Sequence, residues 1–518
     1  MRKDQITQRL APRSNRKREI RMARVVSVTP MSELASFTSV VIPLVVADGS
    51  LSVAAGVPAT VNGVTLPSEI SSEWCEHQGL RAKLGSSVTF RNVDGTSVTL
   101  IVTNGASTSL EQWRQIGAVV AKATPKVPTA MILSISPTGP VSNIAQALVE
   151  GATLASYSYK GGPESSPIGI IVVGPDVQAL TAGATEGVRL GSLVASGVNW
   201  AKHLIDMPAI DLHPKSFANF AIERLEGIPY IDIEIWKDSK IAEERLGGLQ
   251  GVNLGSAQPA RLVQAMYAPA DHPDAPHIVL VGKGVTFDTG GLWLKTAAGM
   301  ATMKTDMSGA AIVISVLATA AEMALPIRIT AIAPLTENMT GGAAMRPGDV
   351  LKIRNGKTVE VINPDAEGRL ILADGLSLAA EREPDAIIDI ATLTGAQVMA
   401  LGEDMGALFA SDDVLAASLL AASAETGEPF WQLPLVDGYE PQLESDVADL
   451  KNLGKPGNAG AIVAALFLRN FTNGVAWAHL DIAGPSRADS TRGYYQRGAT
   501  AFGARTLLQY LITRSRQS

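Results

Sequence analysis

One stretch of the chain, residues 283–369, gathers charged side chains of the types that bind metal ions. It contains four carboxylates, two lysines and an arginine among glycines and apolar runs: Asp288, Asp306, Asp365, Glu367, Lys283, Lys295 and Arg369. Charges in apolar surroundings need partners of the opposite sign. Four carboxylates balance the formal charge of two divalent cations, and two ions about 3.5–4 Å apart are a known device for hydrolysis.

The types of these side chains indicate which ion they would hold. Carboxylate oxygens dominate, and the set contains neither histidine nor cysteine. Such a set suits Mn²⁺ or Mg²⁺ and tolerates Zn²⁺. The alternative is that the residues form ordinary ion pairs and loop carboxylates. The residues alone leave both interpretations open.

The predicted elements would carry these side chains to one edge of a sheet. The apolar run His277–Gly282 predicts a buried strand that ends at Lys283, and Asp288 follows shortly after it. Asp306 stands just before an apolar helix that begins at Met307. Since ligands in open α/β sheets bind beyond the carboxyl ends of the strands, this edge is the expected site.

The segment VINPDAEGRL (Val361–Leu370) carries part of the charged set at a spacing of two residues. That spacing would point Asp365, Glu367 and Arg369 to one side of an extended segment. The Asn-Pro pair before them predicts a sharp turn at its entry. We therefore expect an extended segment that presents all of these side chains together.

The chain around the site predicts an α/β protein in two parts, because 518 residues are too many for one hydrophobic core. Residues 25–178 alternate strands with helices and are expected to form an N-terminal α/β domain. Residues 179–208 predict a long linker helix that stops at Pro208. Residues 209–518 contain near-continuous apolar runs, which predict a catalytic domain with a mixed, mostly parallel sheet covered by helices.

The N-terminal domain has short alternating segments that can be assigned individually. Its strands are predicted at Ser36–Val46, Ser87–Asn92, Ser97–Gly105, Thr129–Ser136 and Ile168–Pro175. Its helices are predicted at Ser109–Ala123 and Ser142–Tyr157, and each opens on a serine that can cap it. No catalytic constellation is visible in the sequence of this domain.

The composition is that of a folded globular protein, with 46% hydrophobic and 18% charged residues. The net charge of −7 excludes a positive field over the whole protein, so nucleic acid is not an expected partner. Cys75 is the only cysteine, which excludes an intrachain disulfide and a cysteine-rich zinc site. Prolines interrupt the uncharged run Val127–Val149, and the run Met307–Ala321 is too short to cross a bilayer, so no membrane segment is expected.

Residues 1–24 form a basic segment, in which arginines and lysines far outnumber acidic residues. No apolar core follows within it, so it is not a secretory signal. We expect a disordered tail, or a start codon placed too early with Met22 as the true start. An arginine-rich organellar presequence is the alternative.

Other catalytic motifs are missing from the sequence. It has no Gly-x-Ser-x-Gly elbow, no Walker A sequence and no complete dinucleotide fingerprint, and its histidines never form His-Glu-x-x-His. His479 is expected to be a structural hydrogen-bonding group near the site rather than a ligand. These absences leave the charged stretch as the candidate site.

The charged stretch is also similar to a known family. NPDAEGRL (Asn363–Leu370) resembles the signature octapeptide of the leucyl aminopeptidases, also called cytosol aminopeptidases. Further segments occur in the family order: VGKGVTFDTGG, MKTDMSGAA, LTENMTGGAAMRPGDVL, DIATLTGA, ADLKNLG, AGAIVAALFLRNF and WAHLDIAG. The resemblance covers residues 190–510, approximately, and is specific. The N-terminal domain is similar to the family only in general plan.

The resemblance implies a metal-dependent aminopeptidase that removes leucine or a similar apolar residue from peptides with a free N-terminus. Asp288 and Glu367 would bridge two divalent ions. Asp365 would complete one ion site, and Lys283 with Asp306 would complete the other. Lys283 would have to be neutral, because an ammonium group cannot ligate, and burial beside dications would lower its pKa.

The resemblance also implies roles for the two remaining charges. A water between the metals would be the nucleophile. Lys295, still protonated, would stabilise the oxyanion of the tetrahedral intermediate. Arg369 would hold a bicarbonate ion that acts as the general base.

The family's substrate contacts match particular residues of this chain. The pocket for the first side chain would be lined by Met303, Thr392, Gly395 and Ala483, and Leu393 would contact the substrate backbone. Ser486 stands where some members have methionine. A cytoplasmic homohexamer is expected by resemblance. The main alternative function is a DNA-binding or regulatory role, which only the basic residues 1–24 support.

Overall fold

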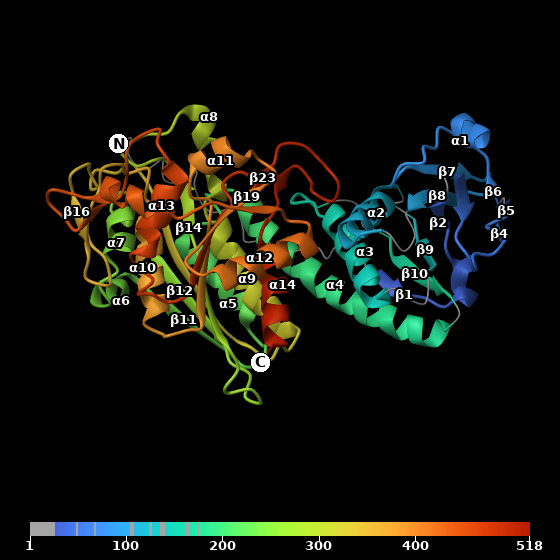
Figure 1. Cartoon of the computed structure of the whole chain (residues 1–518), viewed down its shortest axis with the longest axis horizontal. Helices are drawn as coiled ribbons and strands as arrows, with labels where there is room; N and C mark the ends of the chain where they lie inside the picture. Colours follow the sequence, from blue (N-terminus) through green and yellow to red (C-terminus); the bar gives the residue numbers. More distant parts are fainter. Residues whose placement is uncertain are drawn as a thin grey trace, which may run out of the picture.

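The computed structural model describes residues 26–47, 50–66, 69–103, 108–123, 127–134, 140–161, 166–174 and 176–517. In Figure 1 two α/β lobes lie side by side, and α4 (Val177–Asp206) runs from one lobe to the other. The basic segment at residues 1–24 lies outside the described residues. The α/β class, the long joining helix and the mixed, mostly parallel sheet of the second lobe are confirmed.

The N-terminal lobe is built on a sheet whose central strands run parallel. In spatial order these strands are β1 (Val26–Val28), β10 (Ile168–Val173), β9 (Thr129–Ser134), β2 (Ser39–Ala47) and β8 (Ser97–Thr103). Antiparallel partners flank them: β3 (Ser50–Val53), β6 (Glu69–Ile70) and β7 (Ser87–Arg91). Smaller elements of this lobe are η2 (Met31–Ser36), β4 (Thr60–Val61), β5 (Val64–Thr65) and α1 (Ser72–Gln78).

α2 (Leu110–Ala123) packs against α3 (Val141–Ala155), and α3 packs against α4. The predicted serine cap of α2 is confirmed, because Ser109 Oγ accepts a hydrogen bond from the Gln112 N–H (3.2 Å). The predicted cap of α3 is wrong. This helix begins one residue before Ser142, after Pro140, and has no side-chain cap. The fixed φ of proline is suited to a helix start, so it takes the place of the serine signal.

The second lobe contains a larger sheet that carries the chemistry. Its strand order is β11 (Ile231–Trp236), β12 (Arg261–Tyr267), β15 (Arg328–Asn338), β13 (His277–Gly282), β18 (Ala386–Ala391), β22 (Trp477–Asp481), β19 (Gly406–Ala410) and β20 (Phe430–Gln432). The central strands β15, β13, β18 and β22 are parallel, and β14 (Gly284–Asp288) pairs with the far end of β15. Antiparallel pairing is confined to the flanks.

Helices cover both faces of this sheet, as the unbroken apolar strands require. One face packs against α5 (Pro214–Leu225), α9 (Ser308–Glu322), α12 (Asp413–Thr426) and α14 (Ala504–Ser515). The other face packs against α6 (Asp238–Glu243), α7 (Gly247–Asn253), α10 (Gly368–Ala380) and α13 (Gly460–Arg469). The shorter elements are α8 (Ala297–Met300), η4 (Met303–Thr305), β16 (Val350–Lys352), β17 (Thr358–Glu360), α11 (Gly395–Leu401), η5 (Asp437–Leu443), β21 (Leu450–Lys451), β23 (Arg487–Ala488) and β24 (Gly498–Ala499).

One helical stretch among the described residues, Met303–Glu322, is long and apolar enough to cross a membrane. In its most apolar window 94% of the residues are buried inside the fold. This stretch contains α9, which lies between the sheet and α4. A β-carbon on Gly197 of α4 would lie 2.2 Å from Thr319 Oγ1 of α9, so the glycine allows the two helices to approach closely.

Candidate active site

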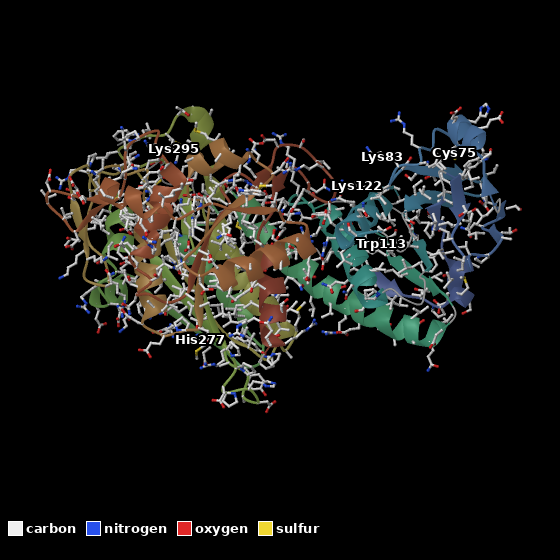
Figure 2. The ribbon with its side chains drawn as sticks, in the orientation of Figure 1. Cys75, Lys83, Trp113, Lys122, His277 and Lys295 are labelled. Carbon is white, nitrogen blue, oxygen red and sulfur yellow. The ribbon has the colours of Figure 1, made fainter. Side chains whose placement is uncertain are left out.

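The charged residues lie at the carboxyl ends of the parallel strands. Lys283 directly follows β13, and Asp288 is the last residue of β14. In Figure 2, Lys295 lies at one edge of the second lobe and His277, the first residue of β13, lies at the opposite edge. The site is therefore at the edge where the strand ends of an α/β sheet leave a crevice.

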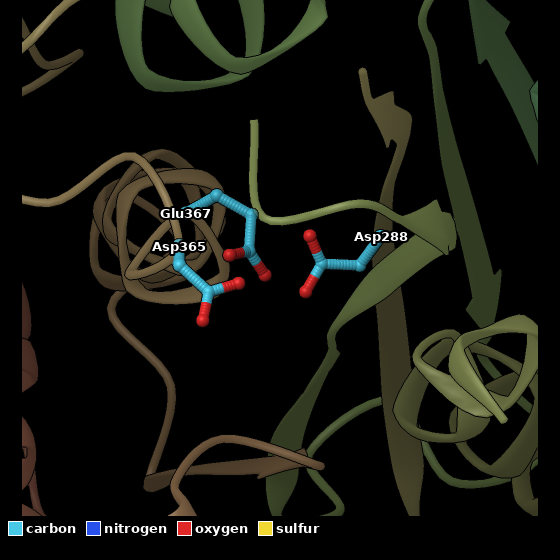
Figure 3. Close-up of side chains that lie close together, drawn as sticks. All are labelled: Asp288, Asp365 and Glu367. Carbon is cyan, nitrogen blue, oxygen red and sulfur yellow. The ribbon is translucent and has the colours of Figure 1, made fainter. Parts of the chain in front are cut away.

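Asp288, Asp365 and Glu367 converge on a common point. Each offers a carboxylate oxygen within 4.8 Å of the others, and Figure 3 shows the three groups facing one another. The expectation of an extended segment is wrong. Asp365 lies in a turn, Glu367 has helical dihedral angles (φ −75°, ψ −37°), and Arg369 is in the first turn of α10. The carboxylates are brought together by a turn that leads into a helix, and not by the alternation of side chains along a strand.

The lysines pair with these carboxylates and with Asp306. Lys283 Nζ lies 2.8 Å from Asp306 Oδ1 and 2.9 Å from Glu367 Oε1. Lys295 Nζ lies 2.8 Å from Asp288 Oδ2 and 2.5 Å from Asp365 Oδ1. All the predicted ligands and Lys295 are therefore in one cluster, and Arg369 adjoins it from α10.

Electrostatics in the cluster favour additional positive charge. Burial raises the pKa of Asp288 and of Asp306, and nearby Glu367 raises both further, against the opposing effect of the lysines. Burial alone would lower the pKa of Lys283 and Lys295, but the surrounding carboxylates hold both pKa values above the ordinary range. Negative charge exceeds what the lysines neutralise, so a cation at this place would be stabilised.

A backbone N–H and a side-chain amide hold the carboxylate of Asp288, at the end of β14. Asp288 Oδ1 accepts hydrogen bonds from the Gly290 N–H (2.8 Å) and from Asn338 Nδ2 (2.9 Å). Asn338 Nδ2 also donates to the Pro364 carbonyl (3.1 Å), which joins β15 to the signature turn. Asn338 was not predicted from the sequence, since a lone amide at a strand end carries no spacing pattern.

A second unpredicted residue, Asn452, holds the signature turn itself. It is fully buried, and its Oδ1 accepts from the N–H groups of Ile362 (2.8 Å) and Asn363 (3.2 Å). Its Nδ2 donates to the Asn363 carbonyl (2.8 Å), and its own carbonyl accepts from Arg369 Nη1 (2.9 Å). Asn452 lies in the segment ADLKNLG, whose family match could have pointed to it.

The residues expected to bind substrate lie on the loops that follow β18 and β22. Thr392 and Leu393 lead into α11, which begins at Gly395, and Ala483 follows β22. Asp481 ties these loops together, because its carboxylate accepts from the N–H groups of Leu393 and Ala483, each at 3.1 Å.

The remaining pocket candidate, Met303, lies on η4, and Asp306 directly follows this helix. The Thr392 hydroxyl donates to Asp306 Oδ1 (2.8 Å), which connects η4 to the loop after β18. The same Thr392 accepts a hydrogen bond through its carbonyl from Lys283 Nζ (3.0 Å). The expected pocket residues and the carboxylate cluster are therefore joined by direct contacts.

His479 stands on β22 with Asp389 as its neighbour in register on β18. Its Nδ1 lies 2.6 Å from Asp389 Oδ1, and Trp477 Nε1 donates to Asp389 Oδ2 (2.7 Å). Burial lowers the pKa of His479, but Asp389 outweighs burial and holds it above the ordinary value. This fully buried pairing is the structural role expected for His479.

The donor set of the cluster fits divalent cations. Asp306 Oδ2 and Glu367 Oε2 are buried and have no hydrogen-bond partner among the described residues. Buried carboxylate oxygens without donors carry free lone pairs, and hard cations take such ligands. The Nε of Arg369 is likewise buried and lacks a partner in the described part of the chain, so it can hold an anion.

Comparison with known proteins agrees with this geometry. Residues 199–508 match the model of the cytosol aminopeptidase family catalytic domain, and residues 45–161 match that of the family's N-terminal domain. A "Probable cytosol aminopeptidase" of Clavibacter michiganensis is 43% identical over 71% of this chain and 77% of that protein. One of a Synechococcus species is 36% identical over 89% of this chain and 96% of that protein.

Solved structures with the same fold include enzymes of this kind. The bottromycin maturation enzyme BotP in complex with Mn has 33% identity and a TM-score of 0.78, covering 95% of this chain and 100% of that one. A tomato leucine aminopeptidase mutant has 30% identity and a TM-score of 0.75, covering 85% of this chain and 86% of that one.

The fold, the carboxylate cluster and the matched family models define the class of protein. The chain belongs to the cytosol aminopeptidase family. It is a metallo-exopeptidase of the leucyl aminopeptidase type, a hydrolase that acts on peptides and depends on divalent metal. The predicted family and enzyme class are confirmed.

Proposed function

We propose that this aminopeptidase holds two divalent ions in the cluster and removes leucine or a similar apolar residue from the N-terminus of peptides. The observation that carries the proposal is the convergence of Asp288, Asp365 and Glu367 within 4.8 Å. Lys283 and Asp306 extend the cluster. Lys283 Nζ lies 2.8 Å from Asp306 Oδ1 and 2.9 Å from Glu367 Oε1. Asp288 and Glu367 would be shared by the two ions, Asp365 would complete one ion site, and Lys283 with Asp306 would complete the other.

The ions are Mn²⁺ or Zn²⁺, with Mg²⁺ as a further option, because oxygen donors dominate the set. When bound, they supply Lewis acidity at the scissile carbonyl and lower the pKa of the attacking water. Lys283 binds as a neutral amine, since an ammonium nitrogen has no lone pair to offer. Its near-complete burial, with 4% of the side chain exposed, supports the neutral form once a dication replaces the proton.

Lys295 and Arg369 do the remaining chemistry. Lys295 is 18% exposed and stays protonated, so its ammonium group stabilises the oxyanion of the tetrahedral intermediate. Arg369 holds a bicarbonate ion as general base, and the unpartnered Nε supports an anion there. Burial lowers the pKa of Arg369 to about 10, which still leaves the guanidinium charged at neutral pH.

The substrate's first side chain binds between Met303, Thr392, Gly395 and Ala483, while Leu393 contacts its backbone. Contacts that join η4, the loop after β18 and the loop after β22 support this pocket. We further propose a homohexamer in the cytoplasm, on family resemblance. We also propose the division of the chain into 25–178, 179–208 and 209–518, which the separate family matches at 45–161 and 199–508 support.

The proposal is tested by metal reconstitution of the full-length protein. Chelated protein is given Mn²⁺ or Zn²⁺ and assayed on 4-nitroanilides of leucine, methionine, phenylalanine and alanine, together with N-acetylated leucine 4-nitroanilide. We expect metal-dependent cleavage of the free amino acid derivatives, fastest for leucine, and no cleavage of the acetylated control. A reconstituted enzyme that cleaves none of the unblocked substrates contradicts the proposal.

A further inference from the structure

A buried carboxylate outside the metal cluster, Asp206, joins three separate parts of the protein. Asp206 is the last residue of α4 and is only 9% exposed. Its Oδ2 accepts a hydrogen bond from the hydroxyl of Tyr157 in the N-terminal lobe (2.9 Å). Its Oδ1 accepts from the N–H of Ala499 (2.9 Å), and Lys304 Nζ donates to its backbone carbonyl.

These partners belong to two sides of the proposed pocket. Lys304 follows Met303 on η4, so the bond to Asp206 anchors the side that Met303 provides. Ala499 lies on β24, which pairs with β23 just after Ala483. Asp206 therefore contacts one element from each side.

Hydrogen bonds connect the end of β24 to the loop after β22. Thr500, the residue after β24, donates from its N–H to the Ser486 carbonyl (3.1 Å) and from its hydroxyl to the Pro485 carbonyl (2.6 Å). Gly498 has a φ of +121°, and a β-carbon on it would lie 2.7 Å from Asp206 Oδ1. The carboxylate is thus packed directly against β24, so a change in its position is transmitted to Ser486.

The N-terminal lobe contacts the same segment elsewhere. Lys122 Nζ donates to the Gly493 carbonyl, and Gln496 Nε2 donates to the Ala155 carbonyl (2.8 Å). Figure 2 shows Lys122 on the side of the N-terminal lobe that faces the catalytic lobe. The segment between β23 and β24 is therefore bounded by the N-terminal lobe on one side and by Asp206 on the other.

The placement of this carboxylate goes against its local electrostatic preference. The C-terminal end of a helix carries partial negative charge and favours cations, so an aspartate is disfavoured there. Burial of the charge disfavours it further. Lys202, one turn earlier, is buried and offsets part of this cost through its attraction to Asp206, and its Nζ lies 4.1 Å from the centroid of the Tyr157 ring. Residues that break local rules in this way concentrate at functional sites.

We propose that Asp206 is a positioning residue that holds the two sides of the side-chain pocket at a fixed separation. Tyr157 orients its carboxylate, so the N-terminal lobe contributes to the choice of the first residue of the substrate. This inference rests on the proposed function and adds to it a determinant of specificity outside the catalytic domain. Asp306 follows η4 directly, but the side chain of Asp206 bonds to Tyr157 and Ala499 rather than to a proposed metal ligand, so we expect substrate binding to depend on Asp206 more than the chemical step does.

The test is a split between KM and kcat across side chains, measured on the full-length, metal-loaded enzyme. Tyr157→Phe removes the hydroxyl without changing the ring. Since hydrogen bonds to charged groups are among the stronger ones, we expect KM for leucine 4-nitroanilide to rise roughly tenfold. kcat should stay within about twofold, and alanine 4-nitroanilide, which does not fill the pocket, should change little in either constant.

Tyr267→Phe is the matched control. The Tyr267 hydroxyl donates to the Leu325 carbonyl (3.0 Å). This hydrogen bond also lies inside the fold, but it involves neither side of the proposed pocket. Tyr267→Phe should leave the leucine-to-alanine ratio of kcat/KM unchanged.

The Asp206 variants give a second, graded readout. In Asp206→Asn the amide oxygen can still accept from Ala499 and the amide nitrogen can donate to Tyr157, so part of the leucine preference should be retained. In Asp206→Ala both contacts are lost and the preference should fall further. Tyr157→Phe decides the question if Asp206→Ala does not fold.

The outcomes separate this inference from the proposed function. Equal loss for leucine and alanine in Tyr157→Phe, or a loss confined to kcat, overturns the positioning role while leaving the peptidase intact. A ratio that shifts equally in Tyr267→Phe overturns it as well. A wild-type enzyme that cleaves no unblocked derivative overturns both the function and this inference.

Discussion

Lys283 and Lys295 share one residue type but have different surroundings. Lys283 is 4% exposed in its side chain and packs against Gly368, whereas 18% of the Lys295 side chain is exposed. The cost of keeping a charge grows with burial, so the two amines respond differently when dications enter. The buried one is suited to bind as a neutral ligand, and the more exposed one is suited to keep its proton and stabilise an anion.

Removing one carboxylate should separate metal binding from folding. We expect Asp365→Asn to bind about one ion fewer per subunit and to lose roughly a thousandfold in kcat, or about 4 kcal/mol of transition-state stabilisation. Its melting temperature without added metal should not fall, because burial and the neighbouring Asp288 outweigh the Lys295 ion pair and raise the pKa of Asp365. Metal analysis, the leucine assay and thermal melting measure the three effects.

Asp437→Asn is the control for this variant. Asp437 lies on η5, and its carboxylate pairs with Arg469 and is 77% exposed, so metal content and activity should match the wild type. Full ion content together with full activity in Asp365→Asn would remove Asp365 from the ligand set.

The sequence predicted residues that belong to a motif and missed those that work alone. The charged set could be found because its members cluster within residues 283–369, among glycines and apolar runs. Asn338 and Asn452 could not be found in this way, since each is a single amide whose partners are distant in sequence. Asn338 bonds to Pro364, 26 residues away, and Asn452 bonds to Asn363, 89 residues away. Asp206 was equally hidden, because its partner Ala499 is 293 residues further along the chain.

At the scale of elements, the start of α10 decides the shape of the site. The sequence predicted the flanking strands well because their apolar runs are continuous. The spacing of two in NPDAEGR favoured an extended segment, yet the structure begins a helix at Gly368. Hydrogen bonds from Asn452 hold the preceding turn, and such tertiary contacts override a local spacing pattern.

Gly368 is the position where that helix start and Lys283 meet. A β-carbon there would lie 2.4 Å from Lys283 Cε and 2.6 Å from its Nζ. We expect Gly368→Ala to displace the amine and lower kcat/KM for leucine 4-nitroanilide by roughly a hundredfold, since small misplacements in an active site have effects of that size. Gly342→Ala, where a β-carbon meets nothing within 4 Å, should behave like the wild type. Unchanged activity in Gly368→Ala would show that Lys283 tolerates displacement.

At the scale of the whole molecule, one of the hydrophobic core clusters spans both lobes, and buried charges also join them. The largest core cluster runs from strands and helices of the N-terminal lobe through α4 to α9 and α14. Arg114 Nε lies 2.6 Å from Glu150 Oε2, and Arg114 Nη1 donates to the Glu425 carbonyl of the catalytic lobe (3.0 Å). The lobes are therefore expected to move as one body, which the proposed role of Tyr157 requires.

Breaking the Arg114 pair should destabilise the junction. The side chains of Arg114 and Glu150 are 5% and 2% exposed, so Arg114→Met removes the nearest cation from a buried carboxylate that keeps Gln146 (2.9 Å) and the more distant Arg505 (4.0 Å). A loss of about 3–5 kcal/mol is expected for such a change, visible as a lower midpoint in denaturant or thermal unfolding. Arg189→Met removes an arginine from a pair that is about half exposed and should change stability by less than about 1 kcal/mol. Equal unfolding midpoints for the two variants would show that the Arg114–Glu150 pair does not contribute to stability in this way.

The contact between Asp206 and Ala499 also determines when, during synthesis of the chain, the pocket can form. The two residues are 293 positions apart. At roughly 5–20 residues per second, about 15–60 s pass between the synthesis of the helix end and that of its partner. The carboxylate cluster is translated within that interval, so a ribosome-bound chain carries its proposed metal ligands before the side-chain pocket can close. The pocket proposed above can therefore be completed only after Ala499 has been synthesised.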